Sequence, residues 1–140
     1  MPRRYVIIHN TGGDFFMGTI KYEVQITAVG KDAVSFLDSN NSFILMDEGI
    51  RPNLKDMVVQ HTVGELVEEI KVGDKLQVGN SNFTVTKVGE NVAKDLREGG
   101  HCTVVINKEG TMPGQVSVKG KIMPRLRINN IVAFYSENDE

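Results

Sequence analysis

The chain has 140 residues, 40% of them hydrophobic and 24% charged, with 16 basic and 18 acidic side chains and a net charge of −2. This length fits one domain, and the mixed charges exclude the basic surface of a nucleic-acid-binding protein. Cys102 is the only cysteine, so an internal disulfide is excluded and a reducing compartment is expected. Because no apolar run approaches the roughly 20 residues of a membrane span and no signal-peptide core is present, the sequence predicts a cytoplasmic protein.

The first twenty residues are expected to form an extra strand or hairpin. Residues 5–8 are the continuous apolar run Tyr-Val-Ile-Ile, which suits a strand covered on both faces. An uncovered strand of this kind would pair with another chain. We therefore expect it to pack onto the rest of the fold or to pair across a homodimer.

Strand patterns dominate the next part of the chain. Residues 20–28 alternate most clearly, with apolar side chains at every second position. Residues 33–38 are compatible with either a strand or a helical turn, and residues 42–46 form a short apolar strand. A Gly-Asp turn precedes an alternating strand that ends at residue 79, and the turn Asn-Ser-Asn then predicts a hairpin with residues 83–88.

One helix is expected, over about residues 91–98. Asn91 can cap it, Val92, Ala93 and Leu96 form an apolar stripe, and two glycines end it. Strands return at residues 101–106, 115–118 and 131–135. Many short strands, frequent glycine turns and one short helix indicate a mainly β fold, a β-barrel or a sandwich, and we predict the barrel.

The stretch around His61 is the candidate for chemistry. Residues 58–63 favour a strand that Gly64 ends, with Val59, His61 and Val63 on one face. A histidine between two valines can be a buried core residue or a nucleophile in an apolar docking face. The residues alone leave both interpretations open.

Several classes of site are not supported by the sequence. It contains no Gly-x-Gly-x-x-Gly or P-loop motif and no Gly-x-Ser-x-Gly elbow. Its three histidines and one cysteine are widely spaced, so no metal site is predicted. No cofactor is expected. From the residues alone, the chain is a β-rich domain with three histidines to explain, of which His9 is expected to be structural or exposed.

Three segments, in this order, carry a resemblance to a known family. Residues 61–66, His-Thr-Val-Gly-Glu-Leu, are similar to the pattern His-x-His-Gly-Glu-Leu. Residues 88–101 look like Val-Gly, a spacer, then Asn-Leu-Arg-Glu-x-Gly-His, with Asp95 at the asparagine position, and residues 113–120 match Pro-Gly-x-Val-x-Val-x-Gly. Over residues 21–136, the chain resembles the glucitol/sorbitol-specific IIA component of the bacterial phosphoenolpyruvate-dependent sugar phosphotransferase system. The remainder, residues 1–20, is the extra segment of an otherwise single domain.

The resemblance implies a phosphotransferase component with a phosphohistidine intermediate. Such a IIA phosphocarrier accepts a phosphoryl group from the small protein HPr and passes it to the IIB component of a permease that also contains IIC. The matching acceptor is His61, an imidazole that is nucleophilic near its reference pKa of about 6.5 without a metal. His101 is expected to contact the phosphate or to satisfy backbone carbonyls at the helix exit.

Three further residues complete the expected site. Glu65 is either an orienter for His61 or a solvated turn residue, and Thr62 and Gly64 are expected to bind the phosphate. Two departures from the family matter: Val63 occupies the position of the second histidine of the motif, and residues 1–20 have no counterpart. They motivate an alternative, a divergent non-catalytic barrel that binds a small ligand or a protein.

Overall fold

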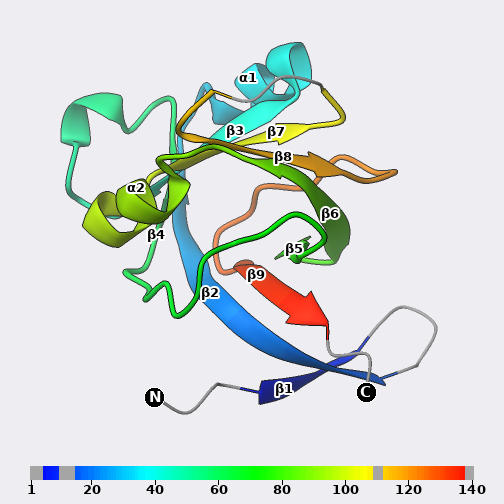
Figure 1. Cartoon of the computed structure of the whole chain (residues 1–140). Helices are drawn as coiled ribbons and strands as arrows, with labels where there is room; N and C mark the ends of the chain where they lie inside the picture. Colours follow the sequence, from blue (N-terminus) through cyan, green and yellow to red (C-terminus); the bar gives the residue numbers. More distant parts are fainter. Residues whose placement is uncertain (1–4, 10–14, 109–111, 138–140) are drawn as a thin grey trace.

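The computed structural model describes residues 5–9, 15–108 and 112–137 (Figure 1). Its strands are β1 (Tyr5–His9), β2 (Phe15–Val29), β3 (Ser42–Asp47), β4 (Val59–His61), β5 (Lys75–Val78), β6 (Ser81–Val88), β7 (Cys102–Ile106), β8 (Gln115–Lys119) and β9 (Ile131–Glu137). Its helices are α1 (Ala33–Asn40) and α2 (Val92–Gly99), and a short 3₁₀ turn spans Pro52–Leu54.

The described strands form one sheet that closes into a ring. The hydrogen-bonded order is β2-β4-β3-β7-β8-β6-β5-β9, and β9 pairs back onto β2. Neighbouring strands are antiparallel except for β3–β4 and β7–β8, which are parallel. Closure satisfies the hydrogen-bonding edges that an open sheet would leave unpaired. The predicted mainly β, barrel-like fold is therefore confirmed.

Strand β2 is the longest strand and contacts three others. Its outer part pairs with β1, its middle with β9 and its last residues with β4. Register shifts opposite β9 and β4 mark irregular points that let the strand change its direction around the ring. In Figure 1, β1 lies against the end of β2 that is remote from both helices. The apolar run of residues 5–8 thus belongs to a strand paired with β2.

The core fills the interior of the ring with apolar side chains from alternate strand positions. On β2, the predicted alternation places Tyr22, Val24 and Ile26 inside, each at most 2% exposed. Opposite them lie buried residues of the other strands: Phe43, Leu45, Leu76, Val78, Phe83, Val85, Val104, Ile106, Val116, Val118, Val132 and Phe134.

The expectation of a single helix is wrong, because residues 33–40 also form one. The sequence left this segment open between a strand and a helical turn. Ala33 and Leu37, four residues apart, are both buried, which is the spacing of one helical face. Asn41 ends α1 in the left-handed conformation, with φ of 53°. Neither helix in the described part of the chain is long and apolar enough to cross a membrane.

Helix α2 follows its prediction to within one residue. Val92 and Leu96 bury the same apolar face, as the spacing indicated. Gly100 caps the helix in the left-handed conformation, with φ of 60°, and donates its N–H to the carbonyl of Leu96 at 3.0 Å. The cap directs the chain from α2 into β7, across one end of β4.

A buried ion pair holds the long irregular segment between β4 and β5 against β2. The Lys21 ammonium donates to Asp74 Oδ2 at 2.7 Å and to the carbonyl of Glu69 at 3.0 Å. The same carboxylate oxygen accepts the N–H of Lys71 at 2.8 Å. Lys21 and Asp74 are only 4% and 6% exposed. Lys21 lies at the register shift between Ile20 and Tyr22 of β2, and its ammonium is covered by the segment that carries Asp74.

We predict that Asp74→Asn lowers the free energy of unfolding by about 3 kcal/mol, because it leaves the Lys21 ammonium buried without its counter-ion. Urea denaturation measures the change. The matched control is Asp56→Asn, which breaks the exposed pair between Lys31 and Asp56 at 3.9 Å and should change stability by less than about 1 kcal/mol. Equal changes in the free energy of unfolding would show that the buried ion pair stabilises the fold no more than the exposed one.

Candidate functional site

His61 is the last residue of β4 and lies between two strands. It is opposite Ile26 of β2 and opposite Asp47 of β3. Its side chain is 0% exposed. Of the two interpretations that the residues alone left open, the structure agrees with a buried histidine, because the imidazole has no contact with solvent.

Strand β4 is shorter than the sequence indicated, and the reason lies at Thr62. The N–H of Thr62 donates to the carbonyl of Gln25 at 2.9 Å, while its hydroxyl accepts the N–H of Gln25 at 3.0 Å. The Thr62 hydroxyl thus accepts the Gln25 N–H that a backbone carbonyl would accept in a regular ladder, and the strand ends at His61. The predicted shared face of His61 and Val63 is wrong, because Val63 is 74% exposed.

Both ring nitrogens of His61 face oxygen atoms. Nδ1 lies 2.7 Å from the Thr62 carbonyl oxygen and 3.7 Å from Asp47 Oδ1, and Nε2 lies 2.9 Å from the carbonyl oxygen of Gly100. A neutral imidazole has one N–H donor, so it can satisfy only one of the two carbonyls; the doubly protonated ring can satisfy both. In the neutral ring, one of the two nitrogens therefore faces a carbonyl oxygen without a proton to donate.

Asp47 is the carboxylate beside His61, and sequence reasoning missed it. Its side chain is 13% exposed, and Oδ1 is buried without a hydrogen-bond partner among the described residues. Burial raises the pKa of this carboxyl, with a smaller opposite effect from His61 and a smaller raising effect from Glu48. The available signal was an aspartate placed directly after the apolar strand of residues 42–46.

Tyr22 forms the wall of the site on the β2 side. Its ring meets that of His61 edge to face, with centroids 6.3 Å apart. The hydroxyl is buried and has no hydrogen-bond partner in the described part of the chain. Burial raises the pKa of Tyr22, and Asp47 and Cys102 add to the effect. The phenol is therefore neutral and presents a proton donor toward the interior.

Gly100 closes the site from the helix side. A Cβ at this position would lie 2.6 Å from His61 Cε1 and would press against the Asp47 carboxylate. Its positive φ independently disfavours a side chain. The Gly-Gly-His end of the second sequence motif is thus the segment that packs directly on the imidazole.

Other predicted site residues lie around this centre. Gly64 is half-buried, and a Cβ there would lie 2.7 Å from Val24 Cγ1. Glu65 is exposed. His101 is half-exposed and donates its N–H to the carbonyl of Asp95 at 3.2 Å, as part of the helix exit.

The backbone after His61 offers donors for an anion. The Thr62 N–H is already bonded to β2, whereas the N–H groups of residues 63–65 make no hydrogen bond within the described residues. Consecutive free N–H groups are a common way to bind an anion. No group of three His, Cys, Asp or Glu residues in the described ranges is placed to hold a metal ion.

Two exposed apolar side chains mark the surface above the site, and we call them the apolar rim. Val63 is 74% and Ile50 49% exposed. Ile50 reaches the helix exit, because a Cβ on Gly99 would lie 3.1 Å from its Cδ1. Val63 follows His61 by two residues, and Ile50 contacts the residue before Gly100.

We predict that Asp47→Asn raises stability at neutral pH. The folded protein holds the Asp47 proton to a higher pH than the unfolded chain does, because its pKa is raised. The stability contributed by the neutral carboxyl is thus present at acidic pH and is lost as pH rises through the folded-state pKa. At pH 7 the variant should unfold at a higher urea concentration than the native chain, and the difference should vanish below about pH 4.

The control for this prediction is Glu90→Gln, which removes the same charge from an exposed position. It should not reproduce the pH-dependent difference. A difference for Asp47→Asn that grows as pH falls would contradict the assignment of a destabilised carboxylate.

Comparisons with known proteins give matches that cover most of the chain. Residues 21–133 match the family of PTS system glucitol/sorbitol-specific IIA components. The chain is similar to the PTS system glucitol/sorbitol-specific EIIA components of Escherichia coli (strain K12) and Shigella flexneri. Each is 30% identical over 120 residues, which cover 84% of this chain and 97% of the relative.

A solved structure supports the fold. The PTS system IIA component from Enterococcus faecalis V583 superposes with a TM-score of 0.68 at 24% sequence identity, covering 79% of this chain and 96% of the other. Strand β1 and the beginning of β2 lie before the residues that the family match covers.

Proposed function

Because the chain belongs to the family of PTS system glucitol/sorbitol-specific IIA components, we propose that it carries its phosphoryl group on His61. The donor is phospho-HPr, the acceptor is the IIB component of a sugar permease, and the exchange takes place in the cytoplasm. The role of phosphocarrier in a sugar phosphotransferase system follows from the family. The observation that supports His61 is its fixed ring, held between the oxygens of Thr62, Asp47 and Gly100.

The oxygen atoms around the ring favour Nε2 as the nucleophile. Two of them, on Thr62 and Asp47, lie near Nδ1, and one, on Gly100, lies near Nε2. In the neutral ring the proton therefore belongs on Nδ1, where these acceptors orient the imidazole. The Nε2 lone pair then forms the bond to phosphorus while the nitrogen–phosphorus bond of the donor breaks, and the proton stays on Nδ1.

Transfer requires that Nε2 be uncovered, since its lone pair faces the Gly100 carbonyl. The covering segment contains Gly99 and Gly100, and glycine backbones change conformation easily. We propose that the donor opens this segment when it docks. The imidazole is then exposed only to the partner, and water has little access to the reacting atoms.

Charge on the transferred group is balanced by backbone donors. The free N–H groups of residues 63–65 follow the acceptor directly, and His101 follows the segment that opens. Such stabilisation and positioning are the main demands of phosphoryl transfer.

We predict that His61→Gln abolishes labelling when the protein is incubated with phosphoenolpyruvate, enzyme I and HPr. Glutamine keeps a polar side chain but has no nucleophilic ring nitrogen. The measurement is intact mass, with an acid-labile, base-stable gain of one phosphoryl group in the native chain. His101→Gln should slow labelling by about tenfold and leave its final extent unchanged.

Two further readouts keep this test decisive. Peptide mapping of the labelled native chain locates the phosphoryl group even if His61→Gln is unstable, and circular dichroism checks the fold of each variant. Labelling of His61→Gln but not of His101→Gln would move the acceptor to His101. No labelling of the native chain, under conditions that label a known IIA domain, would favour the non-catalytic binding module.

The apolar rim gives a separate prediction about docking. Val63→Asp should raise the KM for phospho-HPr by about tenfold with little change in kcat, because a carboxylate would be desolvated in the contact. The control is Val34→Asp on α1, where Val34 is 47% exposed and belongs to an element that does not contact His61. Equal KM values for the two variants would exclude Val63 from the interface.

A further inference from the structure

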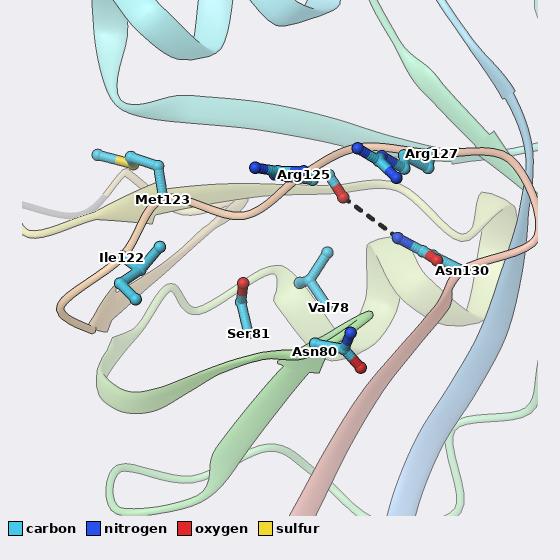
Figure 2. Close-up of a pocket in the computed structure, with 8 residues that line it drawn as sticks. All are labelled: Val78, Asn80, Ser81, Ile122, Met123, Arg125, Arg127 and Asn130. Atoms are coloured by element: carbon cyan, nitrogen blue, oxygen red, sulfur yellow. Dashed lines mark hydrogen bonds between the residues drawn. The ribbon is translucent and has the colours of Figure 1, made fainter. Parts of the chain in front are cut away.

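A pocket lined by both polar and apolar side chains lies away from His61, and the phosphocarrier role does not use it. It has a volume of about 350 Å³, which is at the lower end for small-molecule sites. One side is the turn between β5 and β6, with Asn80 and Ser81. The other is the segment before β9, with Arg125, Arg127 and Asn130 (Figure 2).

In the segment before β9, buried and exposed residues alternate, so Arg125 and Arg127 both lie on its outer side. Pro124 and Leu126 are buried and anchor the segment, whereas Arg125 and Arg127 are exposed. Successive side chains of an extended chain point to opposite sides. The two guanidinium groups therefore line the same side of the pocket, opposite Ser81 and Asn80 in Figure 2.

The backbone around the pocket is held in place by Asn130. Its side-chain amide donates to the carbonyl of Arg125 at 3.3 Å. A Cβ on Gly79 would lie 2.7 Å from the same amide nitrogen, so the turn between β5 and β6 packs closely on Asn130. The arginine-bearing segment and the turn that faces it are thus fixed relative to each other before any ligand arrives.

Both arginines lack a counter-ion among the residues that the structure describes. Neither Arg125 nor Arg127 forms an ion pair within the described residues, although the whole chain carries a net charge of −2. Two unpaired guanidinium groups at a pocket are suited to a doubly charged oxyanion, which each can bind through two N–H donors. The Ser81 hydroxyl and the Asn80 amide can hydrogen-bond neutral oxygens nearby.

We propose that this pocket binds a small hydroxylated phosphate monoester. The phosphate contacts Arg125 and Arg127, and the hydroxyl groups contact Asn80 and Ser81. The exposed Ile122 at the rim of the pocket, 74% exposed, covers part of the carbon chain of the ligand.

The pocket is a different site from the phosphoryl acceptor, and one residue of β2 separates them. The N–H of Ile26 donates to the Asn130 carbonyl at 2.9 Å, and the Ile26 carbonyl accepts the N–H of Asn129 at 2.8 Å. On the other side of β2, Ile26 lies opposite His61. Binding in the pocket can therefore be tested without phosphoryl transfer.

The test is a titration of the full chain followed by amide NMR. The probes are glycerol 3-phosphate, inorganic phosphate and glycerol. We expect saturable shifts at Asn80, Ser81 and Asn130 with glycerol 3-phosphate, weaker binding of inorganic phosphate, and no shifts with glycerol. Absence of saturable shifts at about 10 mM glycerol 3-phosphate would overturn the proposal, and equal affinities for the two phosphates would overturn the assignment to a monoester.

A matched pair of double variants tests the arginines. Arg125→Gln with Arg127→Gln should weaken glycerol 3-phosphate binding by at least about tenfold. Lys119→Gln with Lys121→Gln removes the same charge from exposed positions outside the pocket and should change affinity less than twofold. Equal losses would mean non-specific attraction and would overturn the site.

Phosphoryl uptake from phospho-HPr, measured in the arginine variant, separates this proposal from the phosphocarrier role. Normal labelling of a variant that no longer binds glycerol 3-phosphate is the expected result. If the native chain is labelled but never binds glycerol 3-phosphate, only the pocket proposal fails.

Discussion

The pairing of β2 with β9 on one side and with β4 on the other is the constraint on which the remaining structure depends. Without the β2–β9 ladder, the ring would be an open sheet with two unpaired edges. The same strand supplies Tyr22, Val24 and Ile26 to the core and Lys21 to the buried ion pair. It also fixes the end of β4, because the backbone of Gln25 is satisfied by both the N–H and the hydroxyl of Thr62. The position of His61 is therefore a consequence of how β2 is paired.

The candidate site contains two polar groups whose burial lowers stability, on Asp47 and Tyr22, and a glycine, Gly100, covers it. The Asp47 carboxyl and the Tyr22 hydroxyl each have a buried polar atom without a partner among the described residues, and such atoms lower stability. They are kept together by the parallel pairing of β3 with β4 and sealed by Gly100. Unsatisfied polar groups next to a histidine are typical of functional centres rather than of an inert core.

Sequence patterns were sufficient for the barrel-like sheet, because it depends on local alternation. The three motifs led to the prediction of a site at His61. The face of β2, the hairpin of β5 with β6 and the limits of α2 followed from residues close together in the chain. Helix α1 was left open because the four apolar residues of so short a segment, Ala33, Val34, Phe36 and Leu37, fit either period. Asp47 and Gly100 could not be placed beside His61 from sequence, since β3–β4 pairing and the α2 exit bring them together over long separations. The exposure of Val63 was mistaken because a threonine hydroxyl ended the strand earlier than alternation implied.

Ring closure also has a consequence for how the chain reaches its fold. Strand β2 is synthesised near the beginning and β9 near the end, so the ladder between them joins the most distant parts of the sequence. Contacts of this kind form late and slow folding, since a long loop must close before they contribute any stability. During synthesis, the β9-facing edge of β2 has no native partner until the last strand has left the ribosome. For that interval one edge of the longest strand stays unpaired. Strand β1 cannot cover it, because β1 pairs with Gly18 and Thr19 from the opposite edge of β2.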